Sequence, residues 1–175
     1  IPVRPGDLVV NFGANIGELA LGYYLRGCRV AAIEPDATSL NCLRLNLPRT
    51  LEILPFGLWD RDGTLTFYEK PDSADTSALN QVGRPVEVPV RRLDGLFDGE
   101  RIRLLVGDAE GAEPEVLSGA AGILDRIDWI SIDCGPERNG ERTIDECTNI
   151  LENHGFEVII KGDHLLARNT NIKDK

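Results

Sequence analysis

Short apolar runs and segments of helical periodicity alternate along most of the chain. The apolar runs are nearly continuous, which is typical of strands that are buried on both faces of a parallel sheet. We expect such strands at 8–12, 28–35, 51–59, 101–110 and 129–135, and Pro55 indicates an irregularity in the third of them or a place near the sheet edge. Strands of this kind separated by helices predict an α/β protein whose mostly parallel sheet is covered by helices on both faces.

The helices expected between these strands have recognisable starts and ends. Gly27 suits the end of the first helix and Gly155 the end of the last, because glycine readily adopts the left-handed conformation that follows a helix. Asp36 is an N-cap candidate for the second helix. The expected helices cover 16–27, Asp36 to about Pro48, 113–126 and 141–155.

The middle and the end of the chain depart from this alternation. Residues 64–70 have the pattern of a short half-buried strand, 71–85 that of a loop, and the segment from Val86 begins as extended chain. The last two apolar runs, 156–162 and 164–169, are joined so closely that they can only form a hairpin. The predicted sheet is therefore parallel except for an antiparallel final pair.

Length, composition and charge fit one globular domain over residues 1–175. Hydrophobic residues make up 42% and charged residues 27% of the 175-residue chain, and the net charge is −10. Phosphate binding needs clustered Lys and Arg, so this charge argues against a nucleic-acid partner. No apolar run approaches the ~20 residues of a membrane span, so no membrane partner is expected either.

The cysteines and the start of the chain complete this general picture. Cys28, Cys42, Cys134 and Cys147 lie far apart without a metal-ligand spacing, which predicts reduced, mostly buried thiols in a cytoplasmic protein. No metal site is predicted. The chain starts at Ile1 and contains no Met, so we expect it to be part of a longer polypeptide, with the C-terminal part as one option. The oligomeric state is left open.

The first strand-to-helix turn contains the first candidate binding residues. Its sequence is G-A-N-I-G, with Gly13, Ala14, Asn15 and Gly17, and it lacks the three-glycine pattern of dinucleotide-binding turns. Such a turn lets the backbone approach a smaller group, for example an amino-acid moiety. A plain tight turn is the alternative interpretation.

Glu34 ends the next predicted strand and adds a second candidate. A carboxylate at this place can accept hydrogen bonds from both hydroxyls of a ribose. The alternative is an ordinary solvated acid before Pro35. Together with the glycine turn, Glu34 favours a ligand that contains an adenosine with an unmodified ribose.

A third group of candidates follows the fourth main strand. Asp108, Glu110 and Glu113 lie within six residues in the segment G-D-A-E-G-A-E. Carboxylates at a strand end can orient a hydroxyl group or act as a general base. Glu113 is equally well explained as an acid in the first turn of a helix. Asp133 and Glu137, near the end of the fifth strand, are placed to reach the same cleft.

These motifs together resemble the FkbM family of class I S-adenosylmethionine-dependent methyltransferases over essentially the whole chain. The segments V-V-N-F-G-A-N-I-G-E-L-A, V-A-A-I-E-P, L-W-D-R-D-G-T-L-T-F and V-P-V-R-R-L-D-G-L-F carry the resemblance. The most specific match is G-D-A-E-G-A-E-P-E-V-L-S-G-A at 107–120. The resemblance implies a Rossmann-like sheet with strand order 3-2-1-4-5-7-6 and S-adenosylmethionine as cofactor.

The resemblance also implies roles for the candidate residues. It places Gly13, Asn15 and Gly17 at the methionine part of the cofactor, Glu34 at the ribose, and Trp59 and Asp60 near the adenine. We add the neighbouring Ala14 and Pro35 to this expected cofactor site. We expect Asp108 and Glu110 to be catalytic, by orienting the acceptor and helping to remove its proton. The expected reaction is O-methylation of a sugar, glycan or other small molecule.

Asn11 is the main departure from the family pattern, which usually has an acid at this position. Its amide oxygen is expected to bind the cofactor's ammonium group without contributing a charge. This departure motivates an alternative function, a catalytically weak or inactive domain that binds S-adenosylmethionine as a scaffold. A nicotinamide-dependent oxidoreductase is a further alternative, which the missing middle glycine disfavours.

Overall fold

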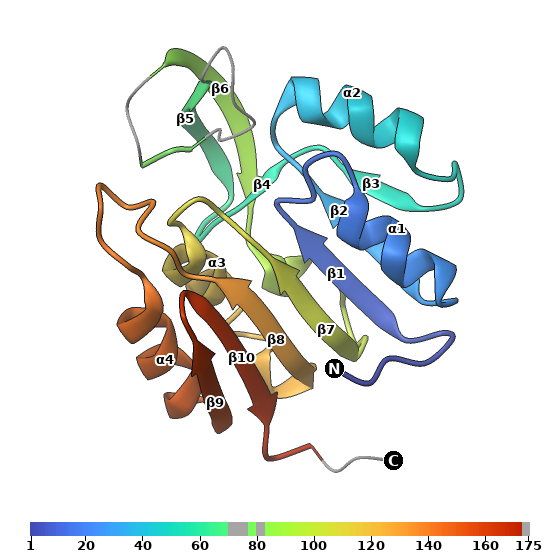
Figure 1. Ribbon diagram of the computed structural model, residues 1–175, viewed down its shortest axis with the longest axis vertical. Helices are drawn as coiled ribbons and strands as arrows, with labels where there is room; N and C mark the ends of the chain where they lie inside the picture. Colours follow the sequence, from blue (N-terminus) through green and yellow to red (C-terminus); the bar gives the residue numbers. More distant parts are fainter. Residues whose placement is uncertain (70–76, 80–82, 173–175) are drawn as a thin grey trace.

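A mostly parallel sheet runs through the computed structural model, which describes residues 1–69, 77–79 and 83–172 (Figure 1). Within these residues the sheet has seven strands in the order β3-β2-β1-β7-β8-β10-β9, and only β10 is antiparallel to its neighbours. This order confirms the predicted 3-2-1-4-5-7-6 arrangement. The strands are β1 (Leu8–Phe12), β2 (Arg29–Ile33), β3 (Glu52–Leu54), β7 (Ile102–Gly107), β8 (Ile127–Asp133), β9 (Phe156–Lys161) and β10 (His164–Asn169).

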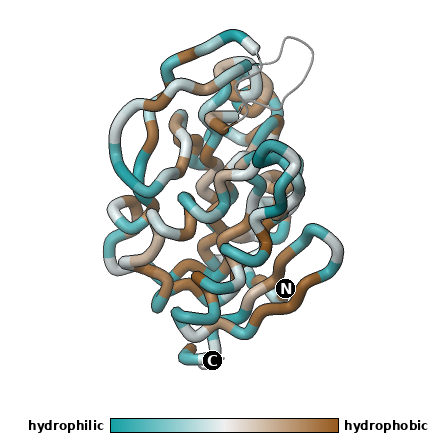
Figure 2. The backbone as a smooth tube through the Cα atoms, turned by 90° about the vertical axis from the view of Figure 1, so that its left-hand side faces the viewer, coloured by the Kyte–Doolittle hydropathy of each residue, from teal (hydrophilic) through white to brown (hydrophobic). Residues whose placement is uncertain are grey.

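Helices cover both faces of this sheet, as the continuous apolar strands predict. Helices α1 (Glu18–Leu25) and α2 (Ala37–Asn46) pack on one face, and α3 (Glu113–Gly119) and α4 (Ile144–Asn153) on the other. Successive residues of β1 point to opposite faces, so that Val9 joins the core under α1 and α2, whereas Val10 joins the core under α3 and α4. In Figure 2, hydrophobic stretches cross the interior and many peripheral loops are hydrophilic.

A second, smaller sheet was not predicted. It contains β4 (Gly57–Leu58), β5 (Gly63–Glu69) and β6 (Arg84–Arg91) in the order β4-β6-β5. The predicted strand 51–59 is therefore wrong as a single element, but the irregularity expected at Pro55 is present, and β3 lies at the edge of the large sheet. The predicted strand is interrupted at Pro55, which has no N–H group for a ladder hydrogen bond, and the chain changes sheets there.

The predicted loop at 71–85 needs a similar correction. Residues 71–76 and 80–82 lie outside the described residues. Of the others, Ser77 forms an antiparallel bridge with Tyr68, and Arg84 and Pro85 already belong to β6.

Two helices are shorter than their apolar periodicity predicts. The helix α1 begins only at Glu18, because Gly17 precedes it with a φ of 99°, and Leu19 remains 51% exposed. The helix α3 ends at Gly119 instead of near Arg126, and a single 3-10 turn, η2 (Leu124–Arg126), follows. A Cβ atom at Gly119 would lie 2.0 Å from the carbonyl oxygen of Trp59, so close packing requires a residue that is a poor helix former.

Several local signals are confirmed. The Asp36 side chain accepts a hydrogen bond from the N–H of Ser39 at 2.7 Å and caps α2. Gly27 and Gly155 follow α1 and α4 with φ values of 82°.

Cys42 is exposed, whereas the other three cysteines are buried and all four are free. Within the described residues, no helix is long and apolar enough to cross a membrane.

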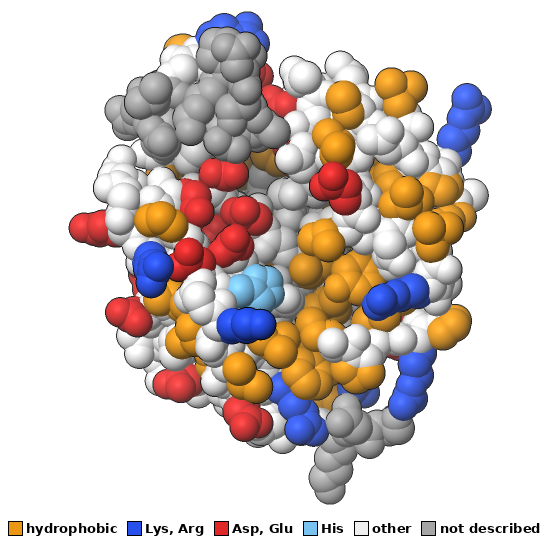
Figure 3. All heavy atoms as spheres, in the orientation of Figure 1, with side chains coloured by type: hydrophobic (Ala, Val, Ile, Leu, Met, Phe, Trp, Pro, Cys, Tyr) orange, Lys and Arg blue, Asp and Glu red, His pale blue; other side chains and the backbone are white. Residues whose placement is uncertain are grey.

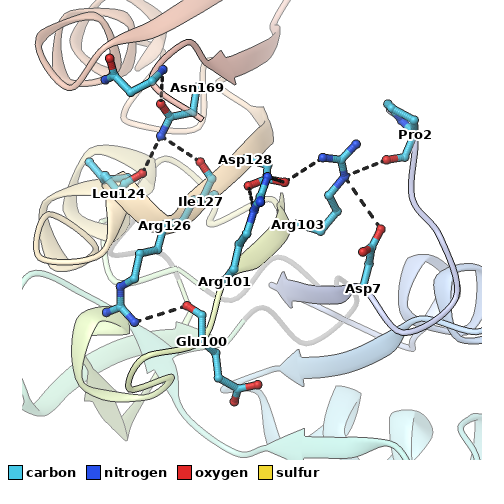
Figure 4. A network of polar contacts seen from close by, with 11 residues as sticks. Pro2, Asp7, Glu100, Arg101, Arg103, Leu124, Arg126, Ile127, Asp128 and Asn169 are labelled. Atoms are coloured by element: carbon cyan, nitrogen blue, oxygen red, sulfur yellow. Dashed lines mark hydrogen bonds and ion pairs between the residues drawn. The ribbon is translucent and has the colours of Figure 1, made fainter. Parts of the chain in front are cut away.

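An ion-pair network around the buried Asp128 joins the starts of β7 and β8 (Figure 4). Arg101 binds both oxygens of the Asp128 carboxylate, at 2.6 and 2.8 Å, and Arg103 binds one of them at 2.7 Å. Arg103 also donates to the carbonyl of Pro2 at 2.9 Å. A separate 3-10 turn, η1 (Leu93–Gly95), lies between β6 and β7 in the chain. Because Asp128 is only 4% exposed, its charge needs these two partners. The network ties the N-terminal segment to the amino ends of β7 and β8.

Candidate functional site

A cavity lies at the carboxyl ends of β1, β2 and β7, where ligands of open α/β sheets bind. Its walls come from three places: the turn after β1, the end of β2, and the loop after β7. The smaller sheet contributes a fourth wall. The topology therefore brings together at one cavity the three groups of residues that the sequence singles out.

The turn after β1 is built around close backbone contacts. Gly13 has a φ of 57°, and a Cβ atom there would lie 1.8 Å from the carbonyl oxygen of Asp108. A Cβ atom at Gly107 would likewise lie 2.1 Å from the carbonyl oxygen of Phe12. The turn after β1 and the loop after β7 therefore touch through their backbones, which only glycine permits. Gly13 and Asn15 line the cavity.

Ala14 and Gly17 have structural contacts instead. The N–H of Ala14 donates to the carbonyl of Ile33 at 3.0 Å, which fixes the turn against β2. A Cβ atom at Gly17 would lie 2.9 Å from the side chain of Leu43, so this glycine lets α1 and α2 pack closely. Neither residue is among those that line the cavity.

Glu34 is held rigidly at the end of β2. Its carboxylate accepts the N–H of Asn15 and the N–H of Asp36, each at 2.8 Å. The side chain is only 6% exposed, and this burial raises the pKa of the Glu34 carboxyl above its usual value, against the lowering effect of the two hydrogen bonds. Each carboxylate oxygen keeps capacity to accept a further hydrogen bond from a ligand. Pro35 lines the cavity beside it.

The fourth wall is aromatic and comes largely from the smaller sheet. Trp59, as expected, lines the cavity, together with Phe56, Phe67 and Ala78. Asp60 does not line it, and its carboxylate contacts Arg61 at 3.0 Å. Sequence reasoning missed Phe56 and Phe67. The alternation of 64–70 signals a half-buried strand, but nothing local shows that this strand pairs with β6, which lies between it and β4.

Asp108 and Glu110 line the cavity from the loop after β7. The N–H of Glu110 donates to the Asp108 carboxylate at 2.9 Å, and Glu110 has a φ of 51°, in the left-handed region that non-glycine residues rarely adopt. Both carboxylates are partly exposed. The loop therefore holds two acids next to each other at the wall of the cavity.

Glu113 determines the shape of this loop. It is fully buried, and its carboxylate accepts the N–H of Ala109 at 2.9 Å, the N–H of Gly111 at 3.2 Å and the hydroxyl of Thr143 at 2.8 Å. Burial raises the pKa of the Glu113 carboxyl. Glu113 thus does more than favour the helix dipole, because it connects the acidic loop to α4.

Asn11 lies within β1, is 1% exposed and does not line the cavity. Its amide nitrogen donates to the carbonyls of Phe12 and Val106, at 3.2 and 3.3 Å. Within the described residues, the side-chain oxygens of Asn11 and Asn15 are both buried without a hydrogen-bond partner. Of the two, only Asn15 lines the cavity, and its unpaired acceptor beside a backbone turn that admits only glycine fits a ligand with N–H donors, such as the amino-acid part of a nucleoside cofactor.

Further acids surround the loop after β7. The pKa of Glu137 is raised, first by burial and then by the nearby charges of Asp108, Asp133 and Asp163. Asp133 and Glu137 do not line the cavity itself. Figure 3 shows acidic side chains gathered on this face of the molecule. Among the described residues, no three His, Cys, Asp or Glu side chains are arranged to hold a metal ion.

The large sheet and its helices define a Rossmann-like methyltransferase fold. The structure is similar to precorrin-6y C5,15-methyltransferase from Geobacter metallireducens, with 14% identity, a TM-score of 0.60, and coverage of 96% of this chain and 82% of the other. It is also similar to magnesium protoporphyrin IX methyltransferase from Synechocystis with bound S-adenosylmethionine, with 11% identity, a TM-score of 0.58, and coverage of 95% and 71%. At these identities the similarity concerns the fold.

The chain belongs to the methyltransferase FkbM domain family, whose match covers residues 11–158. It is 30% identical over 216 residues to the AMB antimetabolite synthetase AmbE of Pseudomonas aeruginosa, covering 95% of this chain and 10% of that protein. It is 29% identical over 210 residues to the 31-O-demethyl-FK506 methyltransferase FkbM of Streptomyces tacrolimicus, covering 95% and 79%. The predicted family is confirmed, and so is S-adenosylmethionine as the cofactor of a domain with this fold.

Proposed function

We propose that the domain methylates a hydroxyl oxygen of a small molecule or glycan. The observation that carries the proposal is the continuity of one cavity from Glu34 at the end of β2 to Asp108 and Glu110 after β7. A ribose anchor and a pair of acids then face the same space. Both relatives resemble this chain over 95% of its length, and the name of one describes methylation at an oxygen.

The proposed cofactor site contains the residues whose geometry fits it. Glu34 would accept hydrogen bonds from the ribose hydroxyls, and Pro35 would border the same ring. Trp59, with Phe56 and Phe67, would enclose the adenine. Gly13 allows the backbone to approach the methionine part, for which the unpaired oxygen of Asn15 provides an acceptor.

The chain's own contribution to catalysis is orientation of the acceptor and removal of its proton. When bound, S-adenosylmethionine supplies an electrophilic methyl group on a sulfonium centre. Asp108 and Glu110 would hold the acceptor hydroxyl and take its proton as the new carbon–oxygen bond forms. Positioning of two reactants is worth on the order of 7–11 kcal/mol, and a general base adds roughly 10²–10⁴-fold. Glu113 would keep both acids in place through Ala109 and Gly111.

Calorimetry with S-adenosylhomocysteine and a methyl-transfer assay on hydroxylated acceptors test this proposal. We expect binding to the unmodified chain, and we expect Asp108→Asn and Glu110→Gln to lower turnover roughly 10²-fold or more while binding is retained. Asp98→Asn is the matched control, because Asp98 is an exposed acid in the loop after η1. A folded sample that does not bind S-adenosylhomocysteine would overturn the proposal.

A second candidate function rests on Asn11. The proposed site lacks the usual acid there, and the Asn11 amide is held by two backbone carbonyls. A scaffolding domain would bind S-adenosylhomocysteine but would show no turnover with any acceptor, and Asp108→Asn would then change nothing measurable. The chain spans only a tenth of the length of the synthetase relative. We also propose that residues 1–175 act as one domain and that the protein works in the cytoplasm, where its four free thiols stay reduced.

A further inference from the structure

The strand β9 forms one edge of the large sheet. It covers Phe156–Lys161 and pairs with β10, and in the part of the chain that the structure describes no other strand pairs with it. In an antiparallel pair, the backbone N–H and C=O groups of alternate residues point away from the partner strand. The outer edge of β9 therefore presents unpaired hydrogen-bonding groups to another chain.

This edge is also unusually apolar for a solvent-facing strand. Ile159 is 58% exposed and Ile160 is 49% exposed, and these two neighbours point to opposite faces of the sheet. The strand contains no proline, and it pairs residue for residue with β10 from end to end without a bulge. Long, regular and apolar edge strands are association sites unless something blocks them.

The opposite edge of the same sheet shows such protection. The strand β3 has only three residues, begins with the charged Glu52, and is followed at once by Pro55. Short length, charge and proline are the features that prevent edge pairing. The strand β9 also carries charges, at Glu157 and Lys161, but it has six residues and no proline. The two edges of one sheet therefore differ in length and regularity, and the contrast indicates that the open edge at β9 has a partner.

The charge pattern of β9 is complementary to itself under a two-fold axis. Glu157, Ile159 and Lys161 share one face of the strand. If a second β9 runs antiparallel with Ile159 opposite Ile159, each Glu157 faces Lys161 of the second copy. On the other face, Val158 faces Ile160 of the second copy. A parallel arrangement in register would instead place Glu157 opposite Glu157, which is repulsive.

We propose that β9 is a homodimerisation surface, at which two copies of the chain join their large sheets into one continuous sheet through antiparallel β9–β9 pairing. The contact is isologous, as a two-fold dimer requires, because the Ile159 pair lies on the axis and every other pair of residues occurs twice. Backbone hydrogen bonds supply the association, the two isoleucines lose exposed apolar surface, and two Glu157–Lys161 pairs fix the register.

Sedimentation velocity and light scattering over a range of concentrations test this dimer on the full chain. We expect the mass to rise from one chain to two as the concentration increases. Glu157→Lys and Lys161→Glu each replace two attractive pairs by two repulsive ones, and each should weaken dimerisation about 5- to 30-fold. Glu152→Lys is the matched control, because it makes the same charge change on an exposed residue of α4, and it should leave the dimer unchanged.

Mixing the two charge variants gives the most direct test of the proposed register. A mixture of Glu157→Lys chains and Lys161→Glu chains has opposite charges at both contacts, so it should dimerise although neither variant does so well alone. The double variant E157K/K161E should also dimerise. Thermal unfolding of each variant verifies its folding, since Lys at position 157 would face Arg168 of the adjacent strand.

Three results would overturn the dimer: an unmodified chain that stays monomeric at several hundred micromolar, single variants that dimerise like the unmodified chain, or a mixture that fails to associate. Methyl transfer plays no part in any of these measurements, so the dimer and the proposed activity stand or fall separately.

Discussion

Glu34 has the most clearly defined role at the scale of single residues, because two backbone N–H groups hold its carboxylate at the cavity wall. We expect Glu34→Gln to weaken binding of S-adenosylhomocysteine about 10- to 100-fold, the range expected from losing hydrogen bonds to a charged group. Glutamine also turns an NH₂ group toward one of the two backbone donors. Calorimetry measures the change, and Glu52→Gln, on the exposed side chain at the start of β3, is the control.

The pH dependence of this binding has a definite sign. Burial raises the pKa of Glu34 above the ordinary 4.5, so the carboxyl takes up a proton at a higher pH than an exposed glutamate does. A protonated carboxyl accepts less well from two ribose hydroxyls, so affinity should fall as the pH decreases through the raised pKa. The effect on folding is opposite. Because the pKa of Glu34 is higher in the folded than in the unfolded chain, this group stabilises the folded state fully at a pH below its pKa in the unfolded chain. The stabilisation is lost as the pH rises through its pKa in the folded chain. Affinity measured from neutral to acidic pH should therefore decline in the unmodified chain and stay flatter in Glu34→Gln.

Asn11 yields a prediction that runs against the family pattern. Restoring the usual acid with Asn11→Asp would place a carboxylate oxygen where the amide now donates to the carbonyls of Phe12 and Val106. Two hydrogen bonds would become repulsive contacts at a position that is 1% exposed. We expect the free energy of unfolding to fall by about 1–3 kcal/mol. Urea unfolding measures this, with the exposed Asn41→Asp as control, and equal stability of the two variants would contradict the explanation.

At the scale of elements, the turn after β1 and the loop after β7 form one unit. Gly13→Ala should lower stability by more than the roughly 1–2 kcal/mol cost of a left-handed alanine, because its Cβ would also meet the Asp108 carbonyl oxygen at 1.8 Å. Gly6→Ala separates the two effects, since Gly6 has a φ of 88° but a Cβ atom there would have nothing within 4 Å. Gly13→Ala should lower both the free energy of unfolding and the affinity for S-adenosylhomocysteine, whereas Gly6→Ala should lower only the free energy of unfolding. Similar losses in both variants would show that the contact is unimportant.

The elements that the sequence predicts well are those with local signals. The glycine turn, the Asp36 cap and the acid at the end of β2 depend on residues close together in the chain, so their positions follow from the sequence alone. The aromatic wall does not, because Phe67 reaches the cavity only through the pairing of β5 with β6, whose first residues have the sequence pattern of a loop. The early end of α3 has the same origin, since Gly119 is required by a contact with the distant Trp59.

Charge is the property that matters most for partners at the scale of the whole molecule. Some solved structures of similar fold are described as RNA methyltransferases, but this chain has a net charge of −10 and acids around its cavity. We expect no change in the fluorescence anisotropy of a labelled tRNA when the chain is added at about 150 mM salt, because phosphate binding depends on clustered cations. Binding that weakens linearly with the logarithm of salt concentration would contradict this expectation.

The smaller sheet has a consequence for how the molecule responds to its cofactor. In the proposed arrangement the ribose is anchored on the large sheet, and the adenine is enclosed by Phe67 of the smaller one and by Phe56 and Trp59, which flank its strand β4. A ligand that contacts both sheets holds them together, because its binding energy is lost when they separate. Amide hydrogens of β5 and β6 should then exchange more slowly with solvent once the site is filled, although most of these residues never touch the ligand. The cofactor would stabilise the packing of the two sheets as well as donate the methyl group.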